Sequence, residues 1–195
     1  MKVDLSDLKK SIESIIFISD QPVSVDKLSL AFPNVVRAQL RKCLKELVEE
    51  WEEFSRGFLL SEIAGGFQFR TDPRYSEDIS NYNKKVRKFR LSRPALEVTA
   101  IIAYKQPVTR VEIESIRGVD SSGVINVLLE RRVIEIKGRK EVIGKPFLYG
   151  TTAEFLEVFG LKSLNDLPTL KELDEITQNL EPSITPDPES NETTL

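Results

Sequence analysis

The feature that most constrains the fold is a short motif that occurs twice in the sequence. An apolar stretch is followed by Gln-Pro-Val and a hydroxyl residue at Gln21–Ser24, and again at Gln106–Thr109. Proline ends the preceding helix, and the Ser or Thr is placed to cap the next one. The motif therefore predicts a duplicated structural unit with a period of 85 residues, the separation of Gln21 and Gln106.

The first copy lies in a recognisable order of elements. Apolar residues with helical spacing predict one helix before Gln21, a short helix at 25–31 and a third helix around 40–48. Two β-rich runs, 58–63 and 67–70, flank an Ala-Gly-Gly turn and predict a hairpin. Three helices followed by a β-hairpin are the plan of a winged helix, a helix-turn-helix unit with a hairpin wing.

The second copy repeats this order. Ser92 can cap a helix, a short helix is expected at 111–116, and Ser121 or Ser122 can cap a third helix that runs to Arg131. Two strands around a Gly-containing turn follow. Thr151-Thr152 then caps one more short helix, which Gly160 ends.

We therefore predict a mostly helical α+β protein with two tandem winged-helix domains. The expected division is an N-terminal winged-helix domain at 1–73, a basic helical connector at 74–91, a C-terminal winged-helix domain at 92–168 and an acidic tail at 169–195. The tail is rich in Pro, Ser, Thr and acidic residues, and we expect it to be disordered because it can bury little apolar surface.

The composition argues against catalysis. The chain has no histidine, which is the commonest general acid or base, and its one cysteine, Cys43, cannot form an internal disulfide or complete a Cys/His metal site. An enzyme would need an unrecognised carboxylate site. We expect no enzyme, no metal, no cofactor and no small-molecule ligand. Cys43 lies in an amphipathic pattern and is predicted to be buried.

The sequence also lacks a membrane-length apolar run or a signal peptide, so we expect a cytoplasmic protein.

A run of positive charge lies between the two predicted domains. Such a cluster could contact nucleic-acid phosphates without reading sequence. The alternative is a solvated connecting helix, its charges partly offset by Glu77 and Asp78. The basic residues are Lys84, Lys85, Arg87, Lys88, Arg90 and Arg93.

The third helix of the second unit has few of the side chains that a DNA-reading helix carries near its start. Its early polar residues are Ser121, Ser122 and Asn126, whereas major-groove readers favour Arg, Lys, Asn or Gln there. Gly123 suggests close packing by another backbone, since glycine disfavours helix. The apolar residues on this helix exceed what a domain core needs. We therefore expect protein contact, with Ile125, Leu129 and Arg132 as candidate contact residues.

Two stretches of the sequence closely resemble the segregation and condensation protein B (ScpB) family. They are "LSRPALEVTAIIAYKQPVTRVEIESIRGVDSSGVINVLLERRVIEIKGRKEVIGKPFLYGTT" in the second unit and "VEEWEEFSRGFLLSEIAGGFQFRTDPRY" in the first. The resemblance spans roughly residues 5–170. It implies a non-enzymatic protein with tandem winged-helix domains that forms a homodimer chiefly through its N-terminal domain.

The resemblance also implies partners. Proteins of this family bind the kleisin ScpA, which joins the heads of the SMC ATPase, in a condensin that compacts and segregates the bacterial chromosome. We therefore expect a nucleoid-associated accessory subunit, with at most weak nonspecific DNA contact. The competing interpretation is a winged-helix transcriptional regulator that binds DNA through the basic connector and the Arg-bearing ends of helices.

Overall fold

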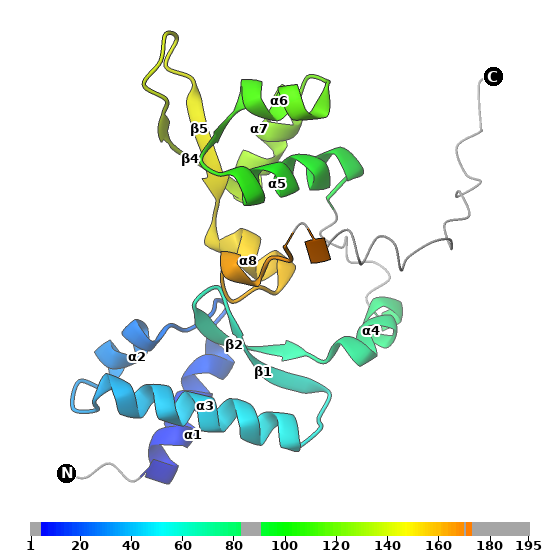
Figure 1. Cartoon of the computed structure of the whole chain (residues 1–195). Helices are drawn as coiled ribbons and strands as arrows, with labels where there is room; N and C mark the ends of the chain where they lie inside the picture. The colour runs from blue at the N-terminus through cyan, green and yellow to red at the C-terminus, as the bar shows by residue number, and fades with distance from the viewer. Residues whose placement is uncertain (1–4, 83–90, 170, 173–195) are drawn as a thin grey trace. The chain divides into compact units, whose positions relative to one another are not determined.

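The computed structural model describes residues 5–82, 91–169 and 171–172 (Figure 1). Helices predominate, and two small antiparallel sheets accompany them, so the predicted α+β class is confirmed. A hairpin follows a set of three helices, and this order occurs twice along the chain. Within the described ranges, no helix combines the length and the apolarity needed to cross a membrane.

The first unit has its helices packed beside one hairpin (Figure 1). Cys43 lies in its core, as predicted, beside apolar residues of the three helices, because side chains three or four residues apart share one helix face. Burial raises the pKa of the Cys43 thiol, so the side chain acts as a small apolar residue. The elements are α1 (Leu5–Ile18), α2 (Val25–Ala31), α3 (Arg37–Glu53), β1 (Phe58–Ile63) and β2 (Gly66–Thr71), followed by a 3-10 turn η1 (Pro73–Tyr75) and α4 (Ser76–Tyr82).

The second unit repeats this order and adds a short strand and a final helix. Its core combines α5, α6 and α7 with the sheet and Phe155 of α8. The elements are α5 (Arg93–Lys105), β3 (Val108–Thr109), α6 (Arg110–Arg117), α7 (Ser122–Glu130), β4 (Ile134–Arg139), β5 (Phe147–Thr151), α8 (Ala153–Phe159) and a 3-10 turn η2 (Leu164–Asp166).

Most of the predicted helix caps are present. Ser24, Ser92 and Thr152 each accept a hydrogen bond from a main-chain N–H in the first turn of the helix that follows. Thr109 forms a full capping box with Glu112, because each side chain accepts from the other residue's main-chain N–H. Ser121 occupies the N-cap position of α7, as predicted, but its side chain makes no capping hydrogen bond.

The Gln-Pro-Val motif has a structural role that the sequence did not reveal. In the second unit its valine, Val108, pairs with Tyr149, which gives a three-stranded sheet in the order β3-β5-β4. In the first unit Val23 pairs with Phe67 of β2 in an isolated bridge. The motif thus adds an antiparallel partner to the second hairpin strand in both units. It also leaves β4 at one edge of the second sheet.

Candidate functional site

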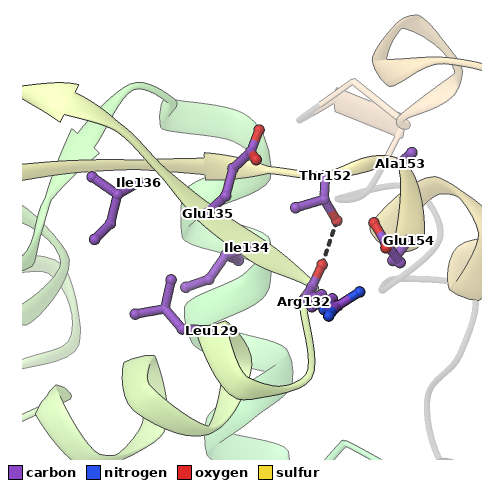
Figure 2. Close-up of a pocket in the computed structure, with 8 residues that line it drawn as sticks. All are labelled: Leu129, Arg132, Ile134, Glu135, Ile136, Thr152, Ala153 and Glu154. Carbon is purple, nitrogen blue, oxygen red and sulfur yellow. Dashed lines mark hydrogen bonds between the residues drawn. The ribbon is translucent and has the colours of Figure 1, made fainter.

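An open groove lies beside β4, at the edge of the second sheet. Its volume is about 470 Å³. It is formed by the end of α7, three consecutive residues of β4 and the junction between β5 and α8 (Figure 2). Two of the three residues predicted to contact a protein partner line it. The lining residues are Leu129, Arg132, Ile134, Glu135, Ile136, Thr152, Ala153 and Glu154.

The end of α7 fixes one wall of the groove through a Schellman motif. The main-chain N–H of Val133 donates to the Leu128 carbonyl at 3.0 Å, and that of Arg132 donates to the Leu129 carbonyl at 2.9 Å. Arg132 has φ of 56°, the left-handed conformation that usually selects Gly or Asn at this position. An arginine held there costs free energy. The position therefore places a guanidinium at the groove despite a local penalty.

The junction between β5 and α8 is tied to the same turn. The Thr152 hydroxyl donates to the Arg132 carbonyl at 2.5 Å (Figure 2) and also accepts from the Phe155 N–H at 3.2 Å, which caps α8. The Thr152 N–H donates to the Val133 carbonyl at 3.3 Å. Thr152, which itself lines the groove, therefore joins the turn after α7 to the start of α8.

The side chains in the groove combine apolar surface with charge. Ile134 and Ile136 lie on the same face of β4, and Glu135 lies on the opposite face, as the alternation of a strand requires (Figure 2). Ile134 is buried, whereas Ile136 is 45% exposed and Leu129 is half-buried. Glu135 forms an ion pair with Lys137. This arrangement suits recognition of a peptide better than catalysis.

The structure corrects the prediction for Ile125. Its side chain is only 2% exposed and belongs to the core of the second unit, together with Leu128. Val127, on the same helix, is 42% exposed. Ile125 therefore cannot contact a partner in this conformation, whereas Leu129 and Arg132 both reach the groove. Their role as contacts stays a prediction.

Gly123 also differs from its expected role. A Cβ atom added at this position would meet no atom within 4 Å, so no backbone outside α7 packs against it within the described part of the chain. Ser121, expected as an early polar contact, is 1% exposed. The Ser121 hydroxyl accepts from Arg117 Nη1 at 2.7 Å, and its N–H donates to Glu114 Oε1 at 3.2 Å. The start of α7 thus directs its buried polar groups inward.

The predicted basic cluster falls mostly outside the described residues. This applies to Lys84, Lys85, Arg87, Lys88 and Arg90. Arg93 lies at the first turn of α5, and its side chain is 94% exposed and 3.9 Å from Glu97. Such an exposed pair contributes little to stability. The structure therefore leaves the proposed phosphate contacts untested.

Outside the groove, the carboxylate with the most strongly lowered pKa among the described residues is Glu112. Three hydrogen bonds, from Lys140 and from the N–H and hydroxyl of Thr109, hold the pKa of Glu112 at about 2. That carboxylate serves the capping box of α6. Among the residues that the structure describes, no group of three or more His, Cys, Asp or Glu side chains could hold a metal ion.

Most of the residues that line the groove could not be predicted from the sequence. Ile134, Ile136 and Glu154 carry no local pattern that distinguishes them from ordinary strand and helix residues. They line a groove because β5 lies between β3 and β4, which leaves one side of β4 open. The one available signal was the position of Leu129 and Arg132 at the end of an unusually apolar helix.

Comparisons with known proteins agree with the family resemblance. The family model described as "Segregation and condensation complex subunit ScpB" matches residues 10–170. Segregation and condensation protein B of Syntrophotalea carbinolica is 48% identical over 92% of this chain and 90% of its own length. The protein of the same name from Myxococcus xanthus is 46% identical over 91% of this chain and 53% of its own length. A crystal structure of ScpB from Mycobacterium tuberculosis is 28% identical, covers 83% of this chain and 99% of that one, and has a TM-score of 0.41.

Proposed function

This chain belongs to the family of segregation and condensation complex subunit ScpB, and we propose that it is a non-enzymatic accessory subunit of the SMC condensin. In this role it binds the kleisin ScpA and, through ScpA, the SMC ATPase, and supports chromosome condensation and segregation. The observation that carries the proposal is the family match over residues 10–170. ATP hydrolysis then belongs to SMC, and this chain works as a cytoplasmic, nucleoid-associated scaffold.

We infer two tandem winged-helix domains with the boundaries expected from the sequence. The support is the repeated order of three helices and a hairpin, in which Val23–Phe67 and Val108–Tyr149 are equivalent pairs. The division at 1–73, 74–91, 92–168 and 169–195 remains part of this proposal. Helix α4 begins in the proposed connector.

The groove beside β4 is the proposed kleisin contact in this chain. It offers apolar side chains from Leu129 and Ile136 next to the guanidinium of Arg132. A flexible segment bound at several such surfaces gains affinity through linked contacts. Ile125 is not part of this surface, because its side chain is buried.

We also propose a homodimer through the first unit. An aromatic cluster there is only partly covered: Phe17 is 72% exposed and Phe54 is 61% exposed. Trp51 lies at its centre, with ring centroids 6.2 Å from Phe54 and 5.0 Å from Phe58. Exposed aromatic patches of this kind mark protein interfaces. Phe17→Glu is expected to convert a dimer into a monomer.

The experiment is mass measurement by light scattering, on this protein alone and mixed with the ScpA-family protein of the same genome. A dimer of about twice the 22.2 kDa chain mass, shifting to a discrete heavier complex, is expected.

Leu129→Glu should weaken the complex about tenfold or more, since it places a charge in the groove. Val127→Glu is the matched control, because Val127 is exposed on the same helix but does not line the groove. A monomer that ignores ScpA would overturn the proposal.

The transcriptional regulator receives less support. The start of α7 has few polar groups available, since the Ser121 hydroxyl and N–H are both bonded within the second unit. DNA retention that falls with salt but shows no base preference would fit auxiliary contact by a condensin subunit. A clear base preference would favour the regulator instead.

A further inference from the structure

Among the residues that the structure describes, no strand pairs with the outer side of β4. The order β3-β5-β4 places it at the end, and its partner on the other side is β5. Such an edge carries main-chain N–H and C=O groups without ladder partners. Extended peptides bind proteins by adding a strand to an edge of this kind.

The register defines which residues of β4 direct their main-chain groups outward. Val133 and Thr152 are opposite each other, and the Thr152 N–H donates to the Val133 carbonyl. In an antiparallel pair, hydrogen-bonded and non-hydrogen-bonded pairs alternate. Glu135, opposite Gly150, is therefore bonded to β5, whereas Ile134 and Ile136 direct their N–H and C=O groups away from β5. In agreement, the N–H of Thr151, opposite Ile134, bonds to Gln106 on the other side of β5.

The groove lies along this same edge. Three consecutive residues, Ile134 to Ile136, line it, and side chains from both faces of a strand can line one groove only where its edge is open. A β-bulge between Ile136 and Gly138 ends the regular edge. At the other end, the turn after α7, in which the Val133 N–H donates to the Leu128 carbonyl, precedes the strand. The available edge is therefore short and bounded at both ends.

The charged and apolar side chains of the groove indicate which kind of peptide segment fits it. Leu129 and the exposed part of Ile136 provide an apolar site on one face of the strand. Within the described part of the chain, Arg132 forms no ion pair, and its side chain is exposed at the mouth of the groove. A carboxylate next to the added strand would complement it. Glu135 already pairs with Lys137, so it competes less for this guanidinium.

We propose that the free edge of β4 binds an extended segment of the partner as an added strand, with an apolar side chain against Leu129 and Ile136 and a carboxylate against Arg132. The main-chain bonds come from Ile134 and Ile136, one N–H and one C=O from each. This inference rests on the proposed function, since the kleisin is the protein that supplies the segment. Beyond that function, it states how the segment binds, as an added strand, and which residues of this chain bind it.

Residue-resolved hydrogen exchange tests the proposal on the full chain, with the ScpA-family protein of the same genome as the probe. At saturation, the amides of Ile134 and Ile136 should exchange roughly tenfold more slowly or better, because they gain hydrogen bonds. The amide of Glu135 is the internal control, since it is already bonded to β5 and should change less. Light scattering in the same samples reports whether the complex has formed.

A pair of variants at one position separates main-chain from side-chain binding. Ile136→Pro removes the outward N–H without removing a bond to β5, and should abolish the complex or weaken it at least as much as any groove variant. Ile136→Ala keeps the N–H and should weaken the complex only partly. If the proline variant does not fold, the exchange measurement on the unaltered protein decides. A complex that leaves Ile134 and Ile136 unprotected would overturn strand addition alone, whereas no complex at all would overturn the proposed function as well.

Discussion

Gln106 and Thr151 are joined through both side chains and the main chain. The Thr151 N–H donates to Gln106 Oε1 at 2.8 Å, and Gln106 Nε2 donates to Thr151 Oγ1 at 3.0 Å. This link connects the end of α5 to the last residue of β5. Gly150 makes room for it, because a Cβ atom there would lie 2.8 Å from Gln106 Oε1. The glutamine of the repeated motif thus bonds to β5 just before β3 begins.

Gln106→Ala is expected to destabilise the protein by roughly 1–3 kcal/mol, because it leaves the buried N–H of Thr151 without a partner. The control is Gln21→Ala at the equivalent position of the first unit. Gln21 is exposed and makes no hydrogen bond among the described residues, so the change should stay within about 0.5 kcal/mol. Denaturant unfolding of both variants measures the difference. Equal effects would show that the two motifs share a role that the geometry does not reveal.

Two glycine-to-alanine changes are expected to have opposite signs. At Gly66 a Cβ atom would lie 2.9 Å from the Pro22 carbonyl carbon and 3.0 Å from that of Val23, and both are backbone atoms. Gly66→Ala should therefore cost about 1–3 kcal/mol of stability through overpacking. Gly123→Ala meets open space in a helix and should stabilise by roughly 0.5–1 kcal/mol. Thermal unfolding compares the two. If Gly123→Ala weakens the ScpA complex while stabilising the chain, a partner backbone packs at that site.

The pH dependence of stability should include a contribution from Glu112. Its pKa is lowered from 4.5 to about 2 by Lys140 and Thr109, so the folded state favours the carboxylate. The stabilisation is fully present above the unfolded pKa and is lost as the pH falls from about 4.5 towards 2. Glu112→Gln should cost a fraction of a kcal/mol up to about 1 kcal/mol at pH 7, since the side chain is 44% exposed and solvent screens it. Denaturant unfolding of both proteins, repeated from pH 7 to pH 2, should show this difference shrinking. A difference that does not change with pH would contradict the assignment.

Arg132→Gly should separate stability from binding. Glycine adopts the left-handed conformation at the end of α7 without strain, so the variant should be more stable by roughly 0.5–1 kcal/mol. The same change removes the guanidinium from the groove, so the affinity for ScpA should fall. Chemical unfolding and titration with ScpA give the two values. A variant that gains stability and keeps full affinity would remove Arg132 from the proposed contact.

The sequence predicted the elements of this fold better than it predicted the groove. Caps at Ser24, Ser92 and Thr152 and the repeated Gln-Pro-Val motif are local signals, and each local geometry followed from them. The inward face of α7 was harder to assign. Apolar residues occupy almost every position from 124 to 129, so helical periodicity alone could not decide that Ile125 is buried and Val127 exposed.

The groove depends on contacts between segments distant in the sequence. The pairing of Val108 with Tyr149 decides which side of β5 is occupied by β3 and therefore which strand lies at the edge. A two-residue strand gives too short a pattern to be recognised in advance. The same limit explains why Ile136 could not be singled out: its exposure follows from the sheet order.

The open side of β4 also has a cost for the cell. An edge that accepts a strand from a partner can accept one from any chain with the same pattern, including another molecule of this protein, and such pairing is a route to aggregation. The alternating charges of Glu135 and Lys137 and the bulge before Gly138 oppose long runs of pairing without closing the short edge at Ile134 and Ile136. If a partner chain occupies this edge as proposed, making this protein in excess of that partner should lead to self-association that begins at this strand.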